Sequence, residues 1–340
     1  MQDFCRTNAG ASIRHRKGFV ALALALSTMM CALAPQPATA FPDRPVRFII
    51  PLPPGGIADI VARVMQPHLE KSFGKPIIIE NRPGASGIIG ANAVHNAAPD
   101  GHSLLFVTTT FSINAALKPN AQYLRALEPV SILAENSLLF LVNPQLKAHS
   151  LKEFVALARQ QKMFYSTPGI ASQAHLLLEA WSRQAGIQMQ HVPYQGGPPA
   201  VLAAVNGEVH LTLISPAASL PQITHGALRA LATSATTREK ELPDLPTAAE
   251  AGFHDFRARQ WIGLVVTAGT PQPIIEQLNP AFQDVLQRED VKDMMSKQGM
   301  TPGRGGGRRP RGDNHINAIG NKVLCGLGET IFGAVCPTQA

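Results

Sequence analysis

The central region of this 340-residue chain, residues 41–300, contains no cysteine. The four cysteines of the sequence stand outside it, at Cys5, Cys31, Cys325 and Cys336. A thiol nucleophile, a thiolate metal site and a disulfide framework are therefore excluded for this region.

The central region also has little net charge, although the whole chain carries +7. Residues 1–40 and residues 301–340 each contribute +3, which leaves 21 basic and 20 acidic residues for 41–300. The sequence of that region contains no basic stripe with interleaved aromatic residues, the pattern typical of proteins that bind nucleic acid. We therefore expect no nucleic-acid partner.

Familiar catalytic signatures are missing as well. The chain has no G-x-S-x-G, H-E-x-x-H or G-x-x-x-x-G-K motif, and residues 41–300 have no G-x-G-x-x-G. The histidines form no i, i+4 pair of the kind that binds metal on a helix. We expect no enzyme, no metal and no cofactor.

The first forty residues have the pattern of an export signal. A basic segment at 14–17 precedes an apolar stretch at 18–33, and small residues at 38–40 provide a cleavage site. The apolar stretch is shorter than the roughly 20 residues that span a bilayer. We predict cleavage near Ala40, a mature chain that begins at Phe41, and a periplasmic location.

Short apolar runs alternate with helical patterns along the rest of the chain. Runs at 46–51, 76–80 and 103–108 form a first set, and runs at 163–166, 189–194, 209–214 and 228–233 form a second. Long apolar strands at 137–142 and 261–267 bracket the second set. This order predicts parallel α/β units in two lobes that are joined by two crossing strands, with a ligand cleft between them. The predicted lobes are 41–140 plus 260–300, and 141–259.

Turns rich in hydrogen-bond donors follow several of these strands. Their glycines free backbone N–H groups, their hydroxyls donate, and a helix start carries partial positive charge. Such turns in both lobes, without a base or nucleophile, describe a clamp for a small organic anion. Asp59 and Ser172 are equally compatible with a structural N-cap role. The candidate ligand-binding residues are Pro53, Gly55, Gly56, Ile57, Asp59, Thr108, Thr109, Thr110, Ser166, Thr167, Gly169, Ser172, Tyr194 and Ser215.

Several ordered motifs resemble one family. They are FPDRPV at 41–46, the loop at 51–59, ENRPGASG at 80–87, APDGH at 98–102, HVPYQG at 191–196, LPDLPTAAEAG at 242–252 and AGTP at 268–271. This set resembles the extracytoplasmic solute receptors of tripartite tricarboxylate transporters, known as the Bug family.

The resemblance implies a two-lobed periplasmic binding protein of the type II-like class, monomeric, that closes on a small carboxylate and delivers it to membrane transporter subunits. It further implies that residues 53–59 and 108–110 hold one carboxylate, partly through waters. Residues 166–172 and Tyr194 would face them from the second lobe. An adaptor that presents the closed form to a membrane sensor kinase would have the same sequence features.

The chain departs from the family pattern at three places. Ile57 and Ala58 replace a glycine and a threonine, and Ile214 stands where the family often has an acidic or amide side chain. The third departure is the glycine- and arginine-rich tail at 301–340, which replaces a final amphipathic helix and suggests a frameshift. A non-functional product of a damaged gene is therefore a further alternative.

Overall fold

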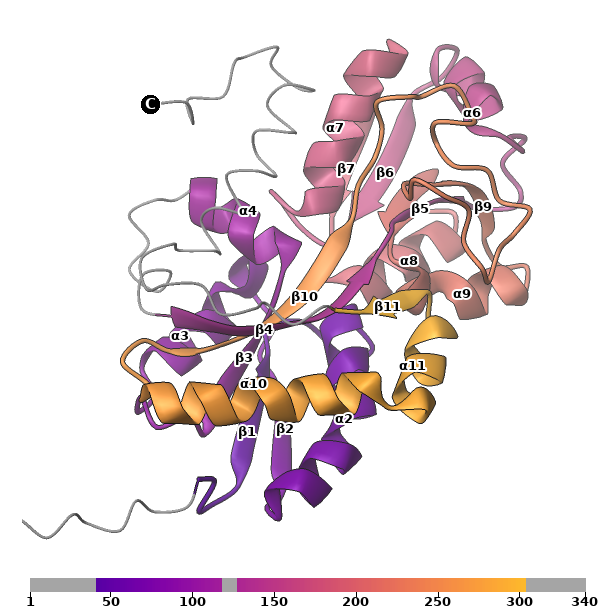
Figure 1. Cartoon of the computed structure of the whole chain (residues 1–340). Coiled ribbons are helices and arrows are strands. Elements are labelled where there is room, and N and C mark those ends of the chain that lie inside the picture. The colour runs from indigo at the N-terminus through magenta and orange to yellow at the C-terminus, as the bar shows by residue number, and fades with distance from the viewer. Residues whose placement is uncertain (1–40, 118–126, 304–340) are drawn as a thin grey trace, which may run out of the picture. The chain divides into compact units, whose positions relative to one another are not determined.

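The computed structural model describes residues 41–117 and 127–303. The predicted export signal and residues 304–340 of the predicted aberrant tail lie outside these ranges. Within them the chain forms two β-sheets with helices on their faces (Figure 1).

The first sheet has six strands in the order β11-β4-β10-β3-β1-β2. Strand β1 pairs in parallel with β2 and β3, as the alternation of strands and helices predicts. Strand β10 pairs antiparallel with β3 and β4, and β11 pairs antiparallel with β4, which the alternation of strands and helices does not predict. The strands are β1 Val46–Ile50, β2 Ile77–Asn81, β3 Ser103–Thr108, β4 Leu127–Asn136, β10 Gln260–Thr267 and β11 Met300–Pro302.

The second sheet has five strands in the order β7-β6-β8-β5-β9. Strand β6 is parallel to β7 and β8, whereas β5 is antiparallel to β8 and β9. The strands are β5 Leu139–Val142, β6 Met163–Thr167, β7 Met189–Pro193, β8 Leu211–Ile214 and β9 Arg229–Thr233.

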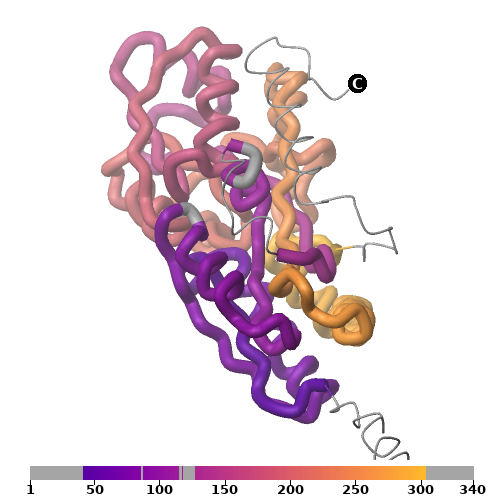
Figure 2. Tube along the Cα trace, turned by 90° about the vertical axis from the view of Figure 1, so that its left-hand side faces the viewer, coloured from indigo at the N-terminus to yellow at the C-terminus, as the bar shows by residue number. Residues whose placement is uncertain are grey.

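Helices cover both faces of each sheet (Figures 1 and 2). Helices α2 and α10 pack against one face of the first sheet and α3 against the other. In the second lobe α6 and α7 lie on one face, with α8 and α9 on the other. The helices are α2 Ile57–Phe73, η1 Ala85–Gly87, α3 Ile88–His95, α4 Thr109–Leu117, α6 Leu151–Ala158, α7 Gln173–Ala185, α8 Gly197–Val205, α9 Pro216–Thr224, α10 Gln272–Gln287 and α11 Glu289–Ser296.

Strand β1 shows why these strands are apolar throughout. Phe48 and Ile49 point to opposite faces because side chains alternate along a strand, and both are buried. Phe48 packs against Phe282 of α10 at a ring-centroid distance of 5.7 Å, while Ile49 contributes to the core under α3. A polar residue at either position would be buried without a partner.

The second lobe has its own aromatic core. Trp181 of α7 is fully buried, and its ring lies 5.1 Å from Phe140 of β5 and 6.0 Å from Phe154 of α6. These contacts fix α6 and α7 on the sheet, and they thereby set the position of the turn that precedes α7.

The chain crosses between the sheets twice. The strand predicted at 137–142 begins only at Leu139, because β4 ends at Asn136 and the chain changes sheets there. The return crossing leads into β10, whose orange segment runs from the second lobe into the first sheet in Figures 1 and 2. The Ser234 hydroxyl accepts a hydrogen bond from the Leu138 N–H (2.9 Å) and donates one to the Ala258 carbonyl (2.8 Å). One side chain thus ties the two crossings together.

Candidate ligand-binding site

A cavity of about 80 Å³ lies between the loops at the carboxyl ends of the parallel strands of both sheets. Ligands bind at such edges in open α/β sheets because loops and helix starts converge there. Its lining comprises Pro51, Leu52, Gly56, Ile57, Gly87, Thr108, Thr110, Phe111, Leu138, Pro168, Ser172, Ala174, Gly197, Leu213, Ile214, Ser215, Ala218 and Gln260.

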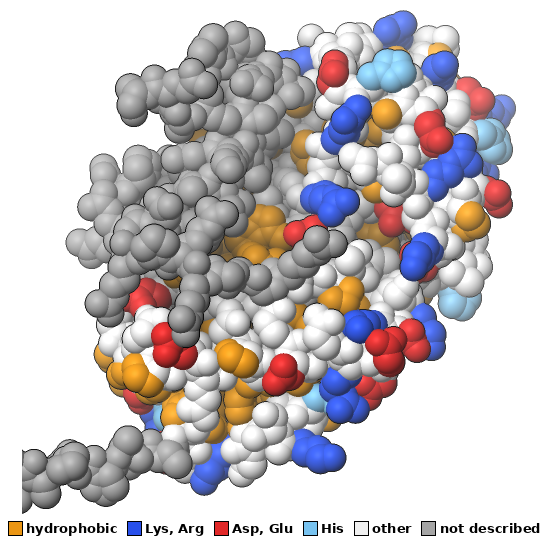
Figure 3. All heavy atoms as spheres, in the orientation of Figure 1, with side chains coloured by type: hydrophobic (Ala, Val, Ile, Leu, Met, Phe, Trp, Pro, Cys, Tyr) orange, Lys and Arg blue, Asp and Glu red, His pale blue; other side chains and the backbone are white. Residues whose placement is uncertain are grey.

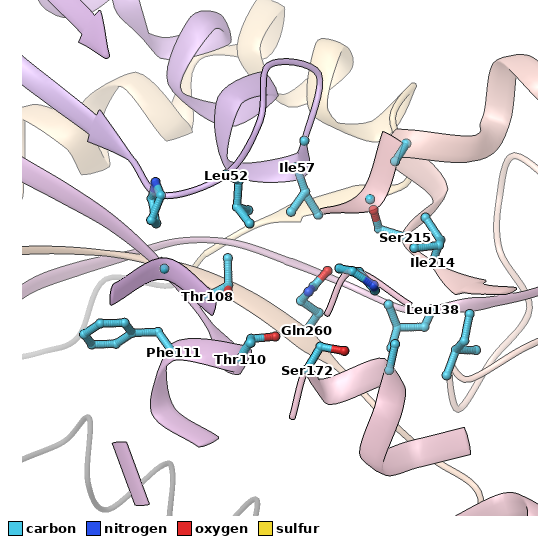
Figure 4. A pocket seen from close by; sticks show the side chains of 18 residues that line it. Leu52, Ile57, Thr108, Thr110, Phe111, Leu138, Ser172, Ile214, Ser215 and Gln260 are labelled. Carbon is cyan, nitrogen blue, oxygen red and sulfur yellow. The ribbon is translucent and has the colours of Figure 1, made fainter. Parts of the chain in front are cut away.

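The loop between β1 and α2 forms one wall. The side chains of Leu52 and Ile57 point from this loop into the cavity (Figure 4). Gly55 has φ +75, which favours glycine, and the Gly56 N–H donates to the Pro53 carbonyl at 3.1 Å. Gly56 is the N-cap of α2 and has no side chain to bond the first N–H groups of the helix.

Asp59 stabilises this loop through hydrogen bonds and does not line the cavity. Its Oδ2 accepts the Gly55 N–H at 2.9 Å and Arg63 Nε at 2.9 Å. Asn81 of β2 donates to both Asp59 Oδ1 and the Leu52 carbonyl, each at 3.0 Å. The loop is therefore braced by two side chains that face away from the cavity.

The ionised form of Asp59 is favoured. Burial would raise the pKa of this carboxyl, but hydrogen bonds from Arg63, the Gly55 N–H and Asn81, together with the Arg63 charge, outweigh burial and lower it. The carboxylate therefore organises the loop at neutral pH.

The three threonines after β3 divide into two roles. Thr108 and Thr110 line the cavity, and Figure 4 shows Thr110 close to Gln260 and Ser172. Thr109 is fully buried, and its Oγ1 accepts the Trp261 N–H at 2.9 Å. Thr109 thus joins α4 to β10 and is not part of the wall.

Of the candidates in the second lobe, only Ser172 and Ser215 reach the cavity. Ser172 is also the N-cap of α7, and its Oγ accepts the His175 N–H at 3.2 Å. Ser172 can therefore cap α7 and contact a ligand at the same time.

The remaining candidates in this lobe have partners elsewhere. Ser166 donates to the Ala200 carbonyl at 2.8 Å, and Tyr194 donates to Glu208 at 3.2 Å. Thr167 Oγ1 and His191 Nε2 share a hydrogen bond of 2.7 Å, and Thr167 also donates to the Gly169 carbonyl. The cavity lining therefore includes none of the candidates Ser166, Thr167, Gly169 and Tyr194. It also lacks Pro53 and Gly55 of the first loop.

The turn at 168–172 rests on a pair of stacked histidines. The His175 and His191 rings are 3.9 Å apart between centroids, and His175 Nδ1 accepts the N–H of Ala171, whose φ is +56. Burial and the neighbouring His175 lower the pKa of His191 to about 4, while Glu179 opposes the shift. Burial likewise lowers the pKa of His175. Both rings are neutral near pH 7, as the bond to Ala171 requires.

The chain is similar to proteins of one family. Residues 61–308 match the family model described as tripartite tricarboxylate transporter family receptor. The chain belongs to this family. Protein BugT of Bordetella pertussis is 36% identical over 275 residues, which cover 79% of this chain and 84% of BugT. The family consists of solute-binding receptors and not of enzymes.

Solved structures of similar proteins confirm the two-lobed α/β fold. Rpa4515 of R. palustris with adipate has a TM-score of 0.78 at 28% identity, over 86% of this chain and 98% of that one. MatC (Rpa3494) from Rhodopseudomonas palustris with bound malate has a TM-score of 0.73 at 29% identity, over 85% and 98%.

Two of the departures from the tripartite tricarboxylate receptor pattern lie at the cavity. Ile57 and Ile214 both line it, and Figure 4 shows them on different elements. Ala58 is fully buried beside Ile57 and is not among the lining residues. The tail beyond Gly303 falls outside the described residues.

The candidates drawn from sequence omit much of the apolar wall and one amide. Leu138 and Gln260 lie at the two crossings, and a single sequence gives no sign that crossings meet a ligand. Asn81 follows an apolar strand within the motif at 80–87, which is the only hint of its role.

The described residues contain no cluster of three or more His, Cys, Asp or Glu side chains placed to bind a metal ion. None of their helices has the length and hydropathy of a membrane span. On the face shown in Figure 3, acidic and basic side chains are interspersed.

Proposed function

We propose that this chain is a periplasmic receptor that binds a small organic carboxylate between its lobes and delivers it to the membrane subunits of a tripartite tricarboxylate transporter. One observation carries the proposal. The cavity lies between the strand-end loops of two lobes, in a fold shared with relatives whose structures hold adipate and malate.

The wall supplies groups suited to a carboxylate. Hydroxyls of Thr108, Thr110 and Ser215 and the Gln260 amide face the cavity. The α2 N-terminus adds backbone N–H groups and the positive end of the helix dipole. Waters could relay hydrogen bonds between these donors and ligands of different length. Residues 41–140 plus 260–300 and residues 141–259 would be the two lobes that close on the ligand.

The binding proposal is tested with the full chain, exported by its own leader and purified from the periplasm. N-terminal sequencing should begin at Phe41. Adipate, malate and monocarboxylates are then compared by thermal shift and calorimetry, since a ligand that binds the native state raises the melting temperature. A shift with a neutral or cationic compound, and with no carboxylate, would contradict the proposal.

Thr108→Val tests the site itself because it removes one hydroxyl at nearly constant volume. A lost hydrogen bond to a charged group costs about 1.5–3 kcal/mol, so affinity should fall roughly 10- to 150-fold. Thr237→Val, at an exposed position away from the cavity, is the matched control. Equal affinity of both variants would remove Thr108 from the site.

The transporter role is tested by uptake of the bound acid into cells with and without the chain. A receptor raises uptake. Binding without any effect on uptake would favour the sensor adaptor.

A further inference from the structure

The cavity wall contains no charged side chain among the described residues. Its five polar side chains are the hydroxyls of Thr108, Thr110, Ser172 and Ser215 and the amide of Gln260. All other lining residues are apolar or glycine. A buried carboxylate needs a full set of hydrogen bonds, because no opposite charge compensates it here.

The donors suited to a carboxylate gather at the first lobe. No acceptor for the N–H of Ile57 or Ala58 lies within the described part of the chain, and the N-cap Gly56 supplies none. Thr108 and Thr110 follow the neighbouring strand β3. These groups are enough to hold one carboxylate.

Each helix start of the second lobe offers fewer free backbone donors for a second carboxylate than the start of α2 does. Helix α8 begins Gly197-Pro198-Pro199 and α9 begins at Pro216, and proline has no N–H. At the start of α7 the Gln173 N–H already donates to Thr110 Oγ1 at 3.3 Å.

Apolar side chains occupy the space that remains. Leu138, Leu213 and Ile214 lie on the side of the second lobe, and Phe111 comes from α4 of the first. Ile214 is 2% exposed and ends β8, directly before Ser215. Figure 4 shows Leu138 and Ile214 grouped on the side of the cavity away from Phe111 and Thr108. This region stabilises an apolar body and leaves a charged group unpaired.

We infer that the ligand carries a single carboxylate at one end and an uncharged, apolar body at the other. This inference rests on the proposed function and narrows its substrate class to monocarboxylic acids. Dicarboxylic acids such as those held by the two relatives are disfavoured because their second carboxylate meets Ile214 and the proline-capped helices.

The test compares acids matched in length, each titrated calorimetrically into the purified mature chain: hexanoate with adipate, butanoate with succinate, and benzoate with terephthalate. The monoacid should bind at least tenfold more tightly in the pair whose size fits best. Methyl hexanoate, which is neutral, should bind at least tenfold more weakly than hexanoate. Equal binding of the ester would overturn the role of the carboxylate.

The failures of the two proposals are distinguishable. A diacid that binds as tightly as its monoacid or more tightly overturns the single-carboxylate inference and leaves the receptor function standing. No binding by any acid in the series overturns the receptor function itself.

A variant adds a second readout. Ile214→Asn places an amide donor at the apolar end and should lower the ratio of monoacid to diacid affinity at least threefold. Ile78→Asn, at a half-exposed position on β2, is the control and should leave that ratio unchanged. If a folded Ile214→Asn chain keeps the wild-type ratio, Ile214 does not set the specificity. The comparison of acids on the unaltered chain decides the inference if that variant fails to fold.

Discussion

Gly196→Ala should weaken ligand binding by acting on a contact between the lobes. Gly196 is the N-cap of α8, at φ 110 and ψ 179, a region that is nearly exclusive to glycine. An added methyl carbon would lie 2.6 Å from Cδ and 2.8 Å from Cγ of Pro53, which belongs to the loop after β1. The substitution therefore strains the backbone and also pushes the two lobes apart.

The backbone strain at Gly196 and the contact with Pro53 differ in size, and each is measured in its own way. The backbone strain should lower the free energy of unfolding by about 1–3 kcal/mol. The contact with Pro53 should penalise the closed arrangement by about 1–2 kcal/mol, which is roughly a 5- to 30-fold loss of affinity. Thermal denaturation measures the first and calorimetric titration with the tightest-binding acid measures the second.

Two further variants separate strain from contact. Gly226→Ala is the control, because Gly226 also has positive φ (+71) but an added methyl carbon meets nothing within 4 Å. It should lose stability and keep its affinity. Pro53→Ala added to Gly196→Ala should restore affinity without restoring stability. The reasoning is refuted if both single glycine variants lose affinity equally, or if the double variant recovers none.

Three more outcomes are expected. Asn81→Ala removes the side-chain donor to the Leu52 carbonyl and to Asp59 Oδ1, while Asp59 Oδ2 keeps its two donors. The substitution should cost about 1–3 kcal/mol of stability by denaturant unfolding, whereas the exposed Asn92→Ala should cost little; equal effects would contradict the bracing role. Asp59 has a lowered folded pKa, so its stabilising contribution is complete above about pH 4 and is lost as pH falls further; Asp59→Asn should flatten this acid dependence. His191 has a pKa of about 4 in the folded chain, so the free energy of unfolding should be unaffected by this ring above about pH 6.5 and should fall as the pH is lowered from there towards 4. An NMR titration midpoint near 6.5 for His191 would refute the burial of its ring.

The sequence predicts well the elements whose signal is local. Strands β1, β3 and β6 are short apolar runs between helical patterns, and the structure has them within a residue or two of the predicted bounds. The sequence does not predict strand β4, because its pattern includes Glu128, Pro129 and Glu135 and its pairing with β10 joins residues more than a hundred positions apart. Such pairing leaves no trace in either segment alone.

The candidate site divides in the same way. The turns after strands correctly predict six residues of the cavity wall, namely Gly56, Ile57, Thr108, Thr110, Ser172 and Ser215. The direction of a side chain within a turn depends on partners that are distant in sequence, so adjacent threonines after β3 take different roles. The sequence does not predict the apolar wall of the cavity, because in a single sequence its residues have the same pattern as ordinary core residues.

The place of β10 in the first sheet has a consequence for the order of folding as the chain emerges from its N-terminus onwards. This strand lies between β3 and β4, although it follows the whole second lobe in the chain. Until residue 267 has emerged, β3 and β4 each lack the neighbour that pairs with their edge. The strands of the second sheet, at 139–233, are complete by then. The second lobe is thus expected to fold first, and the first lobe exposes unpaired strand edges until its last central strand arrives.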